Sequence, residues 1–460
     1  MTIVGGGLAG SEAAWQCALR GVPVRLYEMR PRRPTAVHRT GDLAELVCSN
    51  SFKSVELASS HGLLKEELRR LGSLILECAE ASRLPAGAAL AVDRELFARL
   101  VTGRLERHPL IEIVREEVTR IPDGSPVIIA AGPLCSDPLA AEIARFAGEE
   151  NLAFYDAISP IVEADSIDMG VAFRASRYGK GEGSDYLNCP MTREEYEAFH
   201  DALVTAEEAE VHDFDRGLLF EGCLPVEELA RRGRDTLRFG PLKPVGLVDP
   251  RTGRRPWAVV QLRQDNLAAT HYSLVGFQTR LRWGEQKRVF RMIPALERAE
   301  FVKLGMIHRN TYVNAPRILR ETFEARARRG LFFAGQISGV EGYTESTASG
   351  LLAGLGAAAL VLGGEPPALD PVTALGALGR YVSRAEPKGY QPTNISWGLL
   401  PPLDHPPRGR RERRRALAER ALAALDAFRS GCKLLFEHVP APASPTGTPE
   451  TGDGAAGGRR

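Results

Sequence analysis

Thr2-Ile-Val-Gly-Gly-Gly-Leu-Ala-Gly10 opens the chain. Its three apolar residues predict a short strand, and the glycine turn leads into a helix that we expect to reach about Arg20. A second strand is expected over residues 22–27, directly before Glu28. Strand, helix and strand in this order form a βαβ unit, which predicts a parallel sheet.

The spacing Gly5-x-Gly7-x-x-Gly10, placed between a strand and a helix, is typical of a dinucleotide-binding turn. Gly5 permits the tight turn, Gly7 lets backbone N–H groups approach a pyrophosphate, and Gly10 lets the helix pack on the strand. The start of the helix then faces the phosphates, and Glu28 can accept hydrogen bonds from the adenosine ribose. A glycine turn without a ligand is the alternative, and the βαβ context disfavours it. The predicted nucleotide site consists of Gly5, Gly6, Gly7, Leu8, Ala9, Gly10 and Glu28.

A second glycine turn lies far along the chain, at Gly330-Leu-Phe-Phe-Ala-Gly335, and a small-residue helix is expected from about Glu345 to Leu362. A flavin dinucleotide is long and needs a late strand–glycine–helix element at its ribityl and ring end, whereas an NAD dehydrogenase does not. The two turns together predict FAD, with Gly335 and Gln336 as further ligands.

The sequence pattern changes between residues 156 and 304, where strand-like and loop-like segments alternate with prolines and charged residues. We therefore predict an α/β protein with a Rossmann-like FAD-binding domain of the glutathione-reductase type, interrupted by a smaller mixed α+β inserted domain. The predicted parts are 1–155 and 305–440 for the FAD-binding domain and 156–304 for the insertion. Residues 441–460 are predicted to be a disordered tail.

With 44% apolar and 25% charged residues, the composition is that of a soluble globular protein. No apolar run reaches the roughly 18 residues that cross a bilayer, and the opening residues leave no room for a signal peptide. We expect a cytoplasmic protein without a membrane partner. The net charge of +1 predicts no nucleic-acid partner by itself, the seven scattered cysteines predict no disulfide framework, and no Cys/His spacing predicts a metal site.

Residues 330–350 resemble the late FAD element shared by two kinds of tRNA-uridine-modifying flavoprotein. One kind installs carboxymethylaminomethyl groups at the wobble uridine and is longer by a helical C-terminal domain. The other is the folate- and FAD-dependent tRNA (uracil-5-)-methyltransferase family. Six further segments resemble the second kind, and the resemblance spans about residues 1–435. They are Leu46-Val-Cys-Ser-Asn-Ser51, Tyr186-Leu-Asn-Cys-Pro-Met191, Phe220-Glu-Gly-Cys-Leu-Pro225, 236–247, Met306-Ile-His-Arg-Asn-Thr311 and Trp397-Gly-Leu-Leu-Pro-Pro402.

The resemblance implies a reaction in which methylenetetrahydrofolate supplies the 5-methyl carbon of a T-loop uridine in the T-arm of tRNA. Reduced FAD would supply the electrons, and NADPH or NADH would reduce the flavin. The alternatives are a wobble-uridine-modifying flavoprotein, an NAD(P)H-dependent flavin oxidoreductase that does not act on RNA, and a non-catalytic RNA-binding protein with a structural flavin. The oxidoreductase would want a Cys-x-x-Cys pair, which this sequence lacks.

Carbon 5 of uracil becomes nucleophilic when a thiolate adds at carbon 6, so this chemistry calls for an activated cysteine. Cys223 precedes Pro225, which fits the first position of a helix, and the positive end of that helix would lower the thiol pKa. Cys48 precedes the polar residues 49–51 and Lys53, which predict another helix start. A small buried hydrophobe is the alternative for each. The remaining cysteines are predicted to be structural, in helix or strand packing or near the C-terminal end: Cys17, Cys78, Cys135, Cys189 and Cys432.

His308 resembles the family residue that stacks on the pterin opposite the flavin, and an ordinary packed histidine is the alternative. Glu341 and Tyr343 follow the late glycine turn and are expected near the flavin ring. The proton that leaves carbon 5 could be accepted by Glu341, Glu345 or Cys48, and the sequence leaves this choice open.

Arg408-Gly-Arg-Arg-Glu-Arg-Arg-Arg415 is the strongest charge run. It predicts either a solvated helix face or a surface that binds RNA phosphates. Other candidate ligands for tRNA or for the folate glutamate tail are Arg231, Arg232, Arg234, Arg238 and Lys243.

Overall fold

The computed structural model describes residues 1–35, 37–148, 152–157, 159–181, 183–209, 224–266, 268–305, 307–388 and 390–437. For 152–157 and 307–311 it describes the backbone only. The predicted tail at 441–460 and the predicted nucleophile Cys223 lie outside the described residues.

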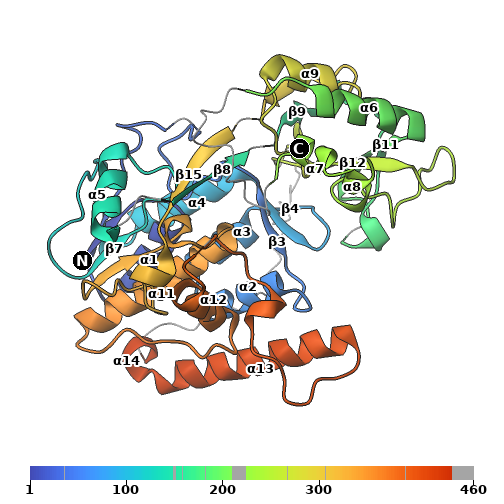
Figure 1. Cartoon of the computed structure of the whole chain (residues 1–460). Coiled ribbons are helices and arrows are strands. Elements are labelled where there is room, and N and C mark those ends of the chain that lie inside the picture. The colour runs from blue at the N-terminus through green and yellow to red at the C-terminus, as the bar shows by residue number, and fades with distance from the viewer. Residues whose placement is uncertain are drawn as a thin grey trace, which may run out of the picture.

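The first layer is a five-stranded parallel sheet in the order β16-β7-β1-β2-β6. It lies in the left half of Figure 1, where β7 and the helices α1 and α11 are labelled. Its strands are β1 (Thr2–Val4), β2 (Val24–Tyr27), β6 (Ile111–Val114), β7 (Val127–Ile129) and β16 (Leu331–Phe333). Helix α1 (Leu8–Ala18) joins β1 to β2, so the predicted βαβ unit is confirmed. The helix ends slightly earlier than expected, and β2 begins only after Pro23, which has no N–H for the ladder.

Helix α11 (Tyr343–Val361) packs directly against α1, and small residues make the close approach possible. A Cβ added at Gly350 would lie 2.2 Å from the carbonyl oxygen of Ala9, and one at Gly354 would lie 3.0 Å from the Cα of Ala13. The predicted late helix is therefore present, and it starts two residues earlier than expected. Since α11 follows β16 and α1 follows β1, the two glycine turns meet at one edge of the sheet.

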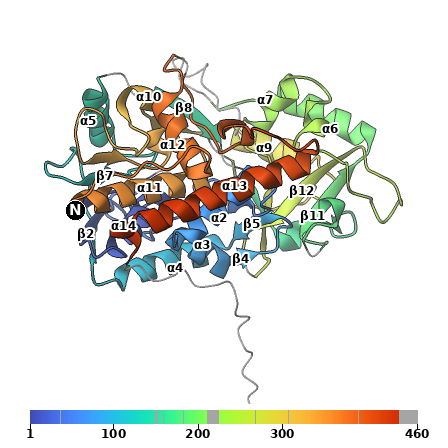
Figure 2. The same cartoon turned by 90° about the horizontal axis from the view of Figure 1, so that it is seen from below.

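Further helices and a small antiparallel sheet surround this layer. The helices are α2 (Ser60–Arg70), α3 (Leu74–Ala81), α4 (Arg94–Glu106), α5 (Asp137–Ala147), α10 (Ala315–Ile318), α12 (Ala374–Arg384), α13 (Arg410–Gly431) and α14 (Lys433–Phe436). The small sheet has the order β3-β5-β4, with β3 (Ser51–Ser54), β4 (Arg83–Leu84) and β5 (Ala89–Val92). Seen from below, α13 crosses under α2 and α11 (Figure 2).

A second, six-stranded antiparallel sheet has the order β10-β11-β12-β13-β9-β14 and buries a hydrophobic cluster of its own. Its strands are β9 (Ile161–Glu163), β10 (Phe173–Arg174), β11 (Tyr186–Met191), β12 (Ala258–Gln264), β13 (His271–Leu274) and β14 (Phe301–Lys303). Its helices are α6 (Arg193–Thr205), α7 (Val226–Arg231), α8 (Thr236–Phe239) and α9 (Trp283–Phe290).

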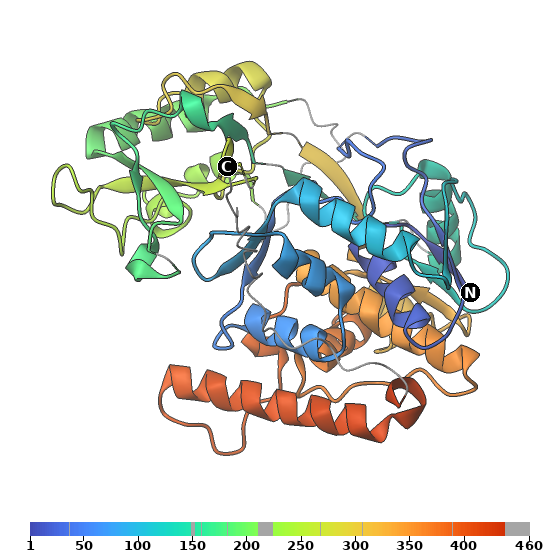
Figure 3. The same ribbon diagram turned by 180° about the vertical axis from the view of Figure 1, so that it is seen from behind.

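Two strands connect this sheet to the first. Strand β8 (Leu152–Ala157) precedes it and β15 (Ile307–Tyr312) follows it, and the two pair antiparallel, so the chain leaves and returns side by side. Figure 3 shows the β3–β5 sheet beside the second sheet, seen from behind. Across the described ranges, no helix has both the length and the apolar character to span a membrane.

Candidate active site

A cavity of about 390 Å³ lies where the carboxyl ends of the parallel strands meet the second sheet. From the first sheet and its turns it is lined by 5–9, Glu28, 130–134, Gly335 and Gln336. From the second sheet and its loops it is lined by Ser159, Arg263, 273–276 and Gln278. Both sheets therefore build one site, and the two predicted glycine turns come together in it.

The first glycine turn has the geometry that a pyrophosphate needs. Gly5 has a φ of +104°, and a Cβ there would lie 2.3 Å from the carbonyl oxygen of Ala130. A Cβ at Gly10 would lie 1.8 Å from the carbonyl oxygen of Gly5. A Cβ at Gly7, by contrast, would meet no protein atom within 4 Å, so the open space there belongs to the cavity. The residues fit a dinucleotide whose phosphates face the start of α1.

Glu28 is buried at the end of β2 and lines the cavity, as the dinucleotide fingerprint predicts. Its carboxylate accepts hydrogen bonds from the backbone N–H of Gly6 (3.0 Å) and of Arg30 (2.9 Å), and from Nε of Arg30 (3.0 Å). Burial alone would raise the pKa of Glu28, but the Arg30 guanidinium and these N–H groups outweigh it and lower the pKa. Glu28 is thus held ionised as an acceptor, and Arg30 is a partner that the sequence did not indicate.

The late turn closes the same cavity. Gly335 has a φ of +80°, its N–H donates to Oγ of Ser349 (2.7 Å), and a Cβ there would lie 3.1 Å from the Cβ of Ala9. Gln336 donates a side-chain hydrogen bond to the carboxylate of Glu341. Gln336 and Glu341 both line the cavity, and the Glu341 side chain is buried.

Tyr343 begins α11 and holds the segment around Cys48. Its hydroxyl oxygen accepts hydrogen bonds from the backbone N–H groups of Cys48 and Ser49, each at 3.0 Å. Burial raises the pKa of Tyr343 well above its ordinary value, so the hydroxyl stays protonated. Tyr343 and the partly exposed Cys48 both line the cavity.

The predicted helix after Cys48 is wrong. The chain continues instead into strand β3, and the next helix begins only at Ser60. The buried amide of Asn50 donates to the carbonyl oxygens of Val92 (3.1 Å) and Gln264 (3.0 Å), so it binds distant strands and does not cap a helix. Cys48 therefore does not stand at the entry to a helix that follows it in the chain.

Cationic side chains surround the Cys48 segment in place of a helix. Arg263 of β12 donates to Oδ1 of Asn50 (2.7 Å) and to Oγ of Ser49 (2.9 Å). Arg94 donates to the carbonyl oxygen of residue 46 (3.3 Å), and Lys303 donates to that of residue 47 (3.2 Å). Burial, reinforced by repulsion from Arg94, lowers the pKa of Lys303 to about 8. No local pattern in the sequence indicates these contacts, because each joins segments far apart in the chain.

Of the three predicted proton acceptors, Cys48 and Glu341 line the cavity and Glu345 does not. Glu345 is fully buried, accepts a hydrogen bond from the N–H of Ile395 (3.0 Å), and lies 3.3 Å from Nδ1 of His61. Burial would raise the pKa of Glu345, but His61 and Lys53 lower it overall. The geometry thus favours Cys48 and Glu341 as groups that can reach a substrate.

The other two predicted site residues are His308 and Cys223, and the side chain of neither is among those described. His308 lies in β15 opposite Asp156 of β8, and only its backbone is described. Downstream of Cys223, Pro225 is the N-cap of α7 and not its first helical residue as expected, and α7 is only six residues long. The first N–H of α7, from Val226, donates to the carbonyl oxygen of Gln278 (2.7 Å), a residue of the cavity wall.

Three of the cysteines predicted to be structural are fully buried, and burial raises the pKa of Cys17, Cys78 and Cys189 to about 12. Cys135 differs from its prediction, because it lies in the turn between β7 and α5 and only partly packs against the core. Among the described residues no group of His, Cys, Asp and Glu side chains could hold a metal ion.

Residues 1–365 match the family GIDA, described as glucose inhibited division protein A. The chain belongs to this family. In fold it is similar to the GidA of Aquifex aeolicus, with a TM-score of 0.67 at 16% identity over 93% of this chain and 73% of that one. The predicted α/β class with a parallel sheet is thus confirmed.

Closer relatives of this GIDA-family chain are named methylenetetrahydrofolate–tRNA-(uracil-5-)-methyltransferase TrmFO. The relative from Symbiobacterium thermophilum is 62% identical over 434 residues, which cover 94% of this chain and 97% of the relative. The relative from Geobacter sulfurreducens is 59% identical and covers 93% and 98%. The predicted membership in the tRNA (uracil-5-)-methyltransferase family is confirmed.

Proposed function

We propose that this protein methylates carbon 5 of a T-loop uridine in tRNA, with methylenetetrahydrofolate as the carbon donor and reduced FAD as the reductant. The observation that supports this most directly is the single cavity that joins a dinucleotide turn to the Cys48 segment, in a chain of the TrmFO family. A tRNA substrate also favours the cytoplasm as its location.

FAD would lie with its pyrophosphate against residues 5–10, its adenosine ribose at Glu28, and its ribityl and ring end at Gly335 and Gln336. When bound it would supply the electrons that convert the transferred methylene into a methyl group, and NADPH or NADH would replenish them. The second sheet supplies the opposite wall, including residues 273–276. We also infer that residues 156–304 form an inserted unit, since β8 and β15 pair at its two ends.

Cys223 is the proposed nucleophile that adds to carbon 6 of the uracil. Cys223 lies two positions before Pro225, and two residues of extended chain span at most about 7 Å. The start of α7 is hydrogen-bonded to Gln278 of the cavity wall. Cys223 would therefore need to cover only this short distance to reach the cavity. The attacking group must be a thiolate. Its addition to carbon 6 makes carbon 5 nucleophilic toward the one-carbon unit.

The proton of carbon 5 must then leave, and Cys48 and Glu341 are the proposed acceptors, since both line the cavity. Tyr343 positions Cys48 by holding the two backbone N–H groups of residues 48 and 49. Arg94 and Lys303 next to this segment favour a thiolate electrostatically. His308, on the connecting strand β15, is the proposed stacking partner of the folate pterin.

Unmodified tRNA, labelled methylenetetrahydrofolate and NADPH test the proposal, with 5-methyluridine as the product measured. Cys223→Ala should abolish the label in tRNA, whereas Cys135→Ala, which changes a cysteine of the β7–α5 turn, should retain it. RNA with 5-fluorouridine should trap the wild-type protein covalently, because fluorine cannot leave as a cation. Labelling confined to a wobble uridine, or NADPH oxidation with no labelled RNA, would refute the proposal. Trapping through Cys48 would reverse the assignment of the two cysteines.

A further inference from the structure

The amino-terminal part of α13 extends beyond the body of the protein. The buried residues of this helix begin only at Leu417 and continue with Ala418, Ala421, Leu422 and Leu425. Residues 410–416 include no buried side chain; most of them are exposed, and Arg414 and Ala416 are partly exposed. We call the first two turns of α13, together with the two residues that precede them, the α13 overhang (residues 408–416). Core packing does not hold this segment.

The sequence of the overhang is unfavourable for an isolated helix. Arginines near the amino-terminal end oppose the helix macrodipole, and Glu412 is the only acidic residue in the first turn. The pairs Arg410/Arg414 and Arg411/Arg415 place like charges four residues apart, where they repel. A local sequence that conflicts with its own fold and gains no packing is typical of a functional surface.

The arginines of the overhang also have few hydrogen-bond or ion-pair partners. Arg415 pairs with Glu419 at 2.8 Å, and Nε of Arg413 donates to the carbonyl oxygen of Pro407 at 3.4 Å. In the part of the chain that the structure describes, no side-chain hydrogen bond or ion pair engages the guanidinium groups of Arg408, Arg410, Arg411 and Arg414. By contrast, Arg69 and Arg70 on the neighbouring α2 both pair with Glu66. The overhang thus presents several uncompensated guanidinium groups.

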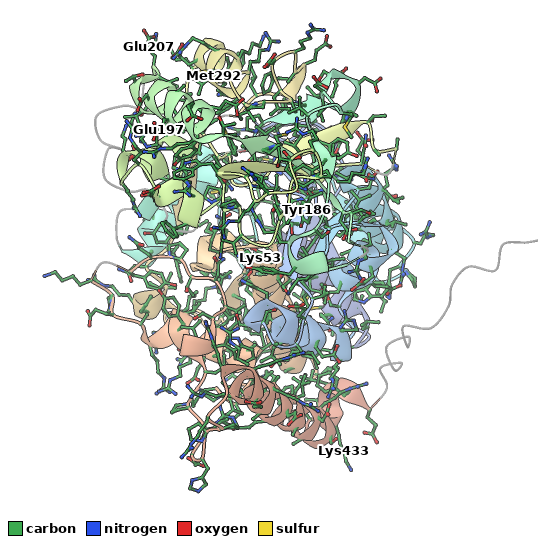
Figure 4. The ribbon with its side chains drawn as sticks, turned by 90° about the vertical axis from the view of Figure 1, so that its right-hand side faces the viewer. Lys53, Tyr186, Glu197, Glu207, Met292 and Lys433 are labelled. Carbon is green, nitrogen blue, oxygen red and sulfur yellow. The ribbon has the colours of Figure 1, made fainter. Side chains whose placement is uncertain are left out.

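The overhang lies on the side of the molecule that also presents the rim of the cavity. Helix α13 starts at the right of Figure 1 and runs left towards α14, so its first residues belong to the side that faces the viewer in Figure 4. Lys53, which lines the cavity, is labelled on that same side, between the second sheet above and α13 below. The loop before α13 links the two places, because Asn394 lines the cavity and Arg420 of α13 donates to the carbonyl oxygens of residues 401 and 402.

We propose that the α13 overhang binds backbone phosphates of the tRNA whose uridine enters the cavity. This inference rests on the proposed function. The planar guanidinium groups suit phosphate oxygens, and several of them spaced along a helix suit a ligand with regularly spaced anionic groups. Bound phosphates would neutralise the arginines and relieve the repulsion among them. The destabilisation that this repulsion causes in the overhang would therefore be smallest in the complex with RNA.

The test is the triple variant Arg410→Gln, Arg411→Gln and Arg414→Gln, compared with a control that removes three arginines elsewhere. The control is Arg25→Gln, Arg145→Gln and Arg329→Gln, whose positions lie towards the amino-terminal edge of the parallel sheet. Affinity for unmodified tRNA is measured between about 50 and about 200 mM salt. The overhang variant should bind more weakly, with a plot of log affinity against log salt that is shallower by about 1 for each lost phosphate contact, up to about 3. The control should keep the wild-type slope.

Folding is monitored through the flavin spectrum and the midpoint of thermal unfolding. In the overhang variant the flavin spectrum should be unchanged, and the midpoint of thermal unfolding should be unchanged or slightly higher. The reason is that Gln removes like-charge repulsion without removing a packed side chain. An unchanged salt slope, or an equal loss in the control, would overturn the inference even if the wild-type protein methylates tRNA. A wild-type protein that neither binds nor methylates tRNA would instead refute the proposed function.

Discussion

Gly7 and Gly10 belong to one turn, but the structure assigns them different constraints. A side chain at Gly10 would collide with the carbonyl oxygen of Gly5, whereas one at Gly7 would project into the cavity. Gly10→Val should therefore abolish bound FAD and also lower the thermal stability of the protein without its flavin. Gly7→Ala should weaken FAD binding while leaving the stability of the flavin-free protein unchanged. Flavin absorbance and thermal unfolding of both variants check this, and equal loss of stability in both would contradict it.

Tyr343→Phe removes the oxygen that accepts the N–H groups of Cys48 and Ser49. Leaving a buried donor without a partner costs about 1–3 kcal/mol, and the cost falls on the segment that presents Cys48. We expect FAD content to stay near the wild-type level and methylation to fall about tenfold or more. Amide exchange in residues 47–50 should accelerate. Unaltered exchange with reduced activity would mean that the hydroxyl acts on the substrate and not through this segment.

The sequence predicted Glu28 and the two glycine turns because their signals lie within a few residues and depend on backbone geometry. It predicted the wrong structure after Cys48, since the polar residues 49–51 have the composition of a helix cap but bind strands that are distant in the chain. Arg263 was missed for the same reason. Its role depends on β12 lying beside the Cys48 segment, which no local pattern encodes.

Among the secondary-structure elements, α2 and α12 are joined by one buried carboxylate. Glu67 accepts hydrogen bonds from the N–H groups of Ala374 (2.7 Å) and Leu375 (2.9 Å) at the start of α12. Burial raises the pKa of Glu67 from 4.5 to about 7, despite these N–H groups. The folded protein therefore retains a proton between these two pH values that the unfolded chain releases, and the stability it contributes is lost as the pH rises through that window.

Glu67→Gln should remove this pH dependence, because glutamine does not ionise. The free energy of unfolding of the wild type relative to the variant should fall by on the order of 3 kcal/mol between about pH 4.5 and about pH 7. Denaturant unfolding at several pH values measures it. Glu66→Gln, at the neighbouring and partly exposed position of α2, is the control. A difference that is constant with pH would show that Glu67 is ionised throughout.

Elements with a strong local period were predicted well, and elements defined by pairing were not. Helices α1 and α11 follow from apolar or small-residue periodicity, and their ends differ by only a few residues from expectation. The change of texture after residue 155 indicated a different unit, but the order β10-β11-β12-β13-β9-β14 depends on contacts between segments separated by long loops. The face of that sheet that meets the cavity could not be derived from the alternation of its strands alone.

In the whole molecule, two sheets with separate hydrophobic clusters share one cavity. Arg263 reaches from β12 to the Cys48 segment, and Arg94 of α4 pairs with Asp265 at 3.0 Å just beyond that strand. These buried contacts are polar and directional, so they define one relative position of the two sheets. A ligand that touches both walls should therefore stabilise the arrangement as a unit, and not only the glycine turns.

Hydrogen exchange with and without FAD tests this coupling. The N–H of Val275 donates to the carbonyl oxygen of Gln261 (2.9 Å) and that of Leu274 to Pro160 (3.1 Å), so both amides report on the second-sheet wall of the cavity. FAD should slow exchange in residues 272–278 as well as in residues 4–10, because opening either wall requires loss of the ligand. Residues 193–205 of α6, which do not line the cavity, are the internal control and should change little. Protection limited to residues 4–10 would mean that the second sheet only borders the cavity, and that Arg263 holds the Cys48 segment independently of the flavin.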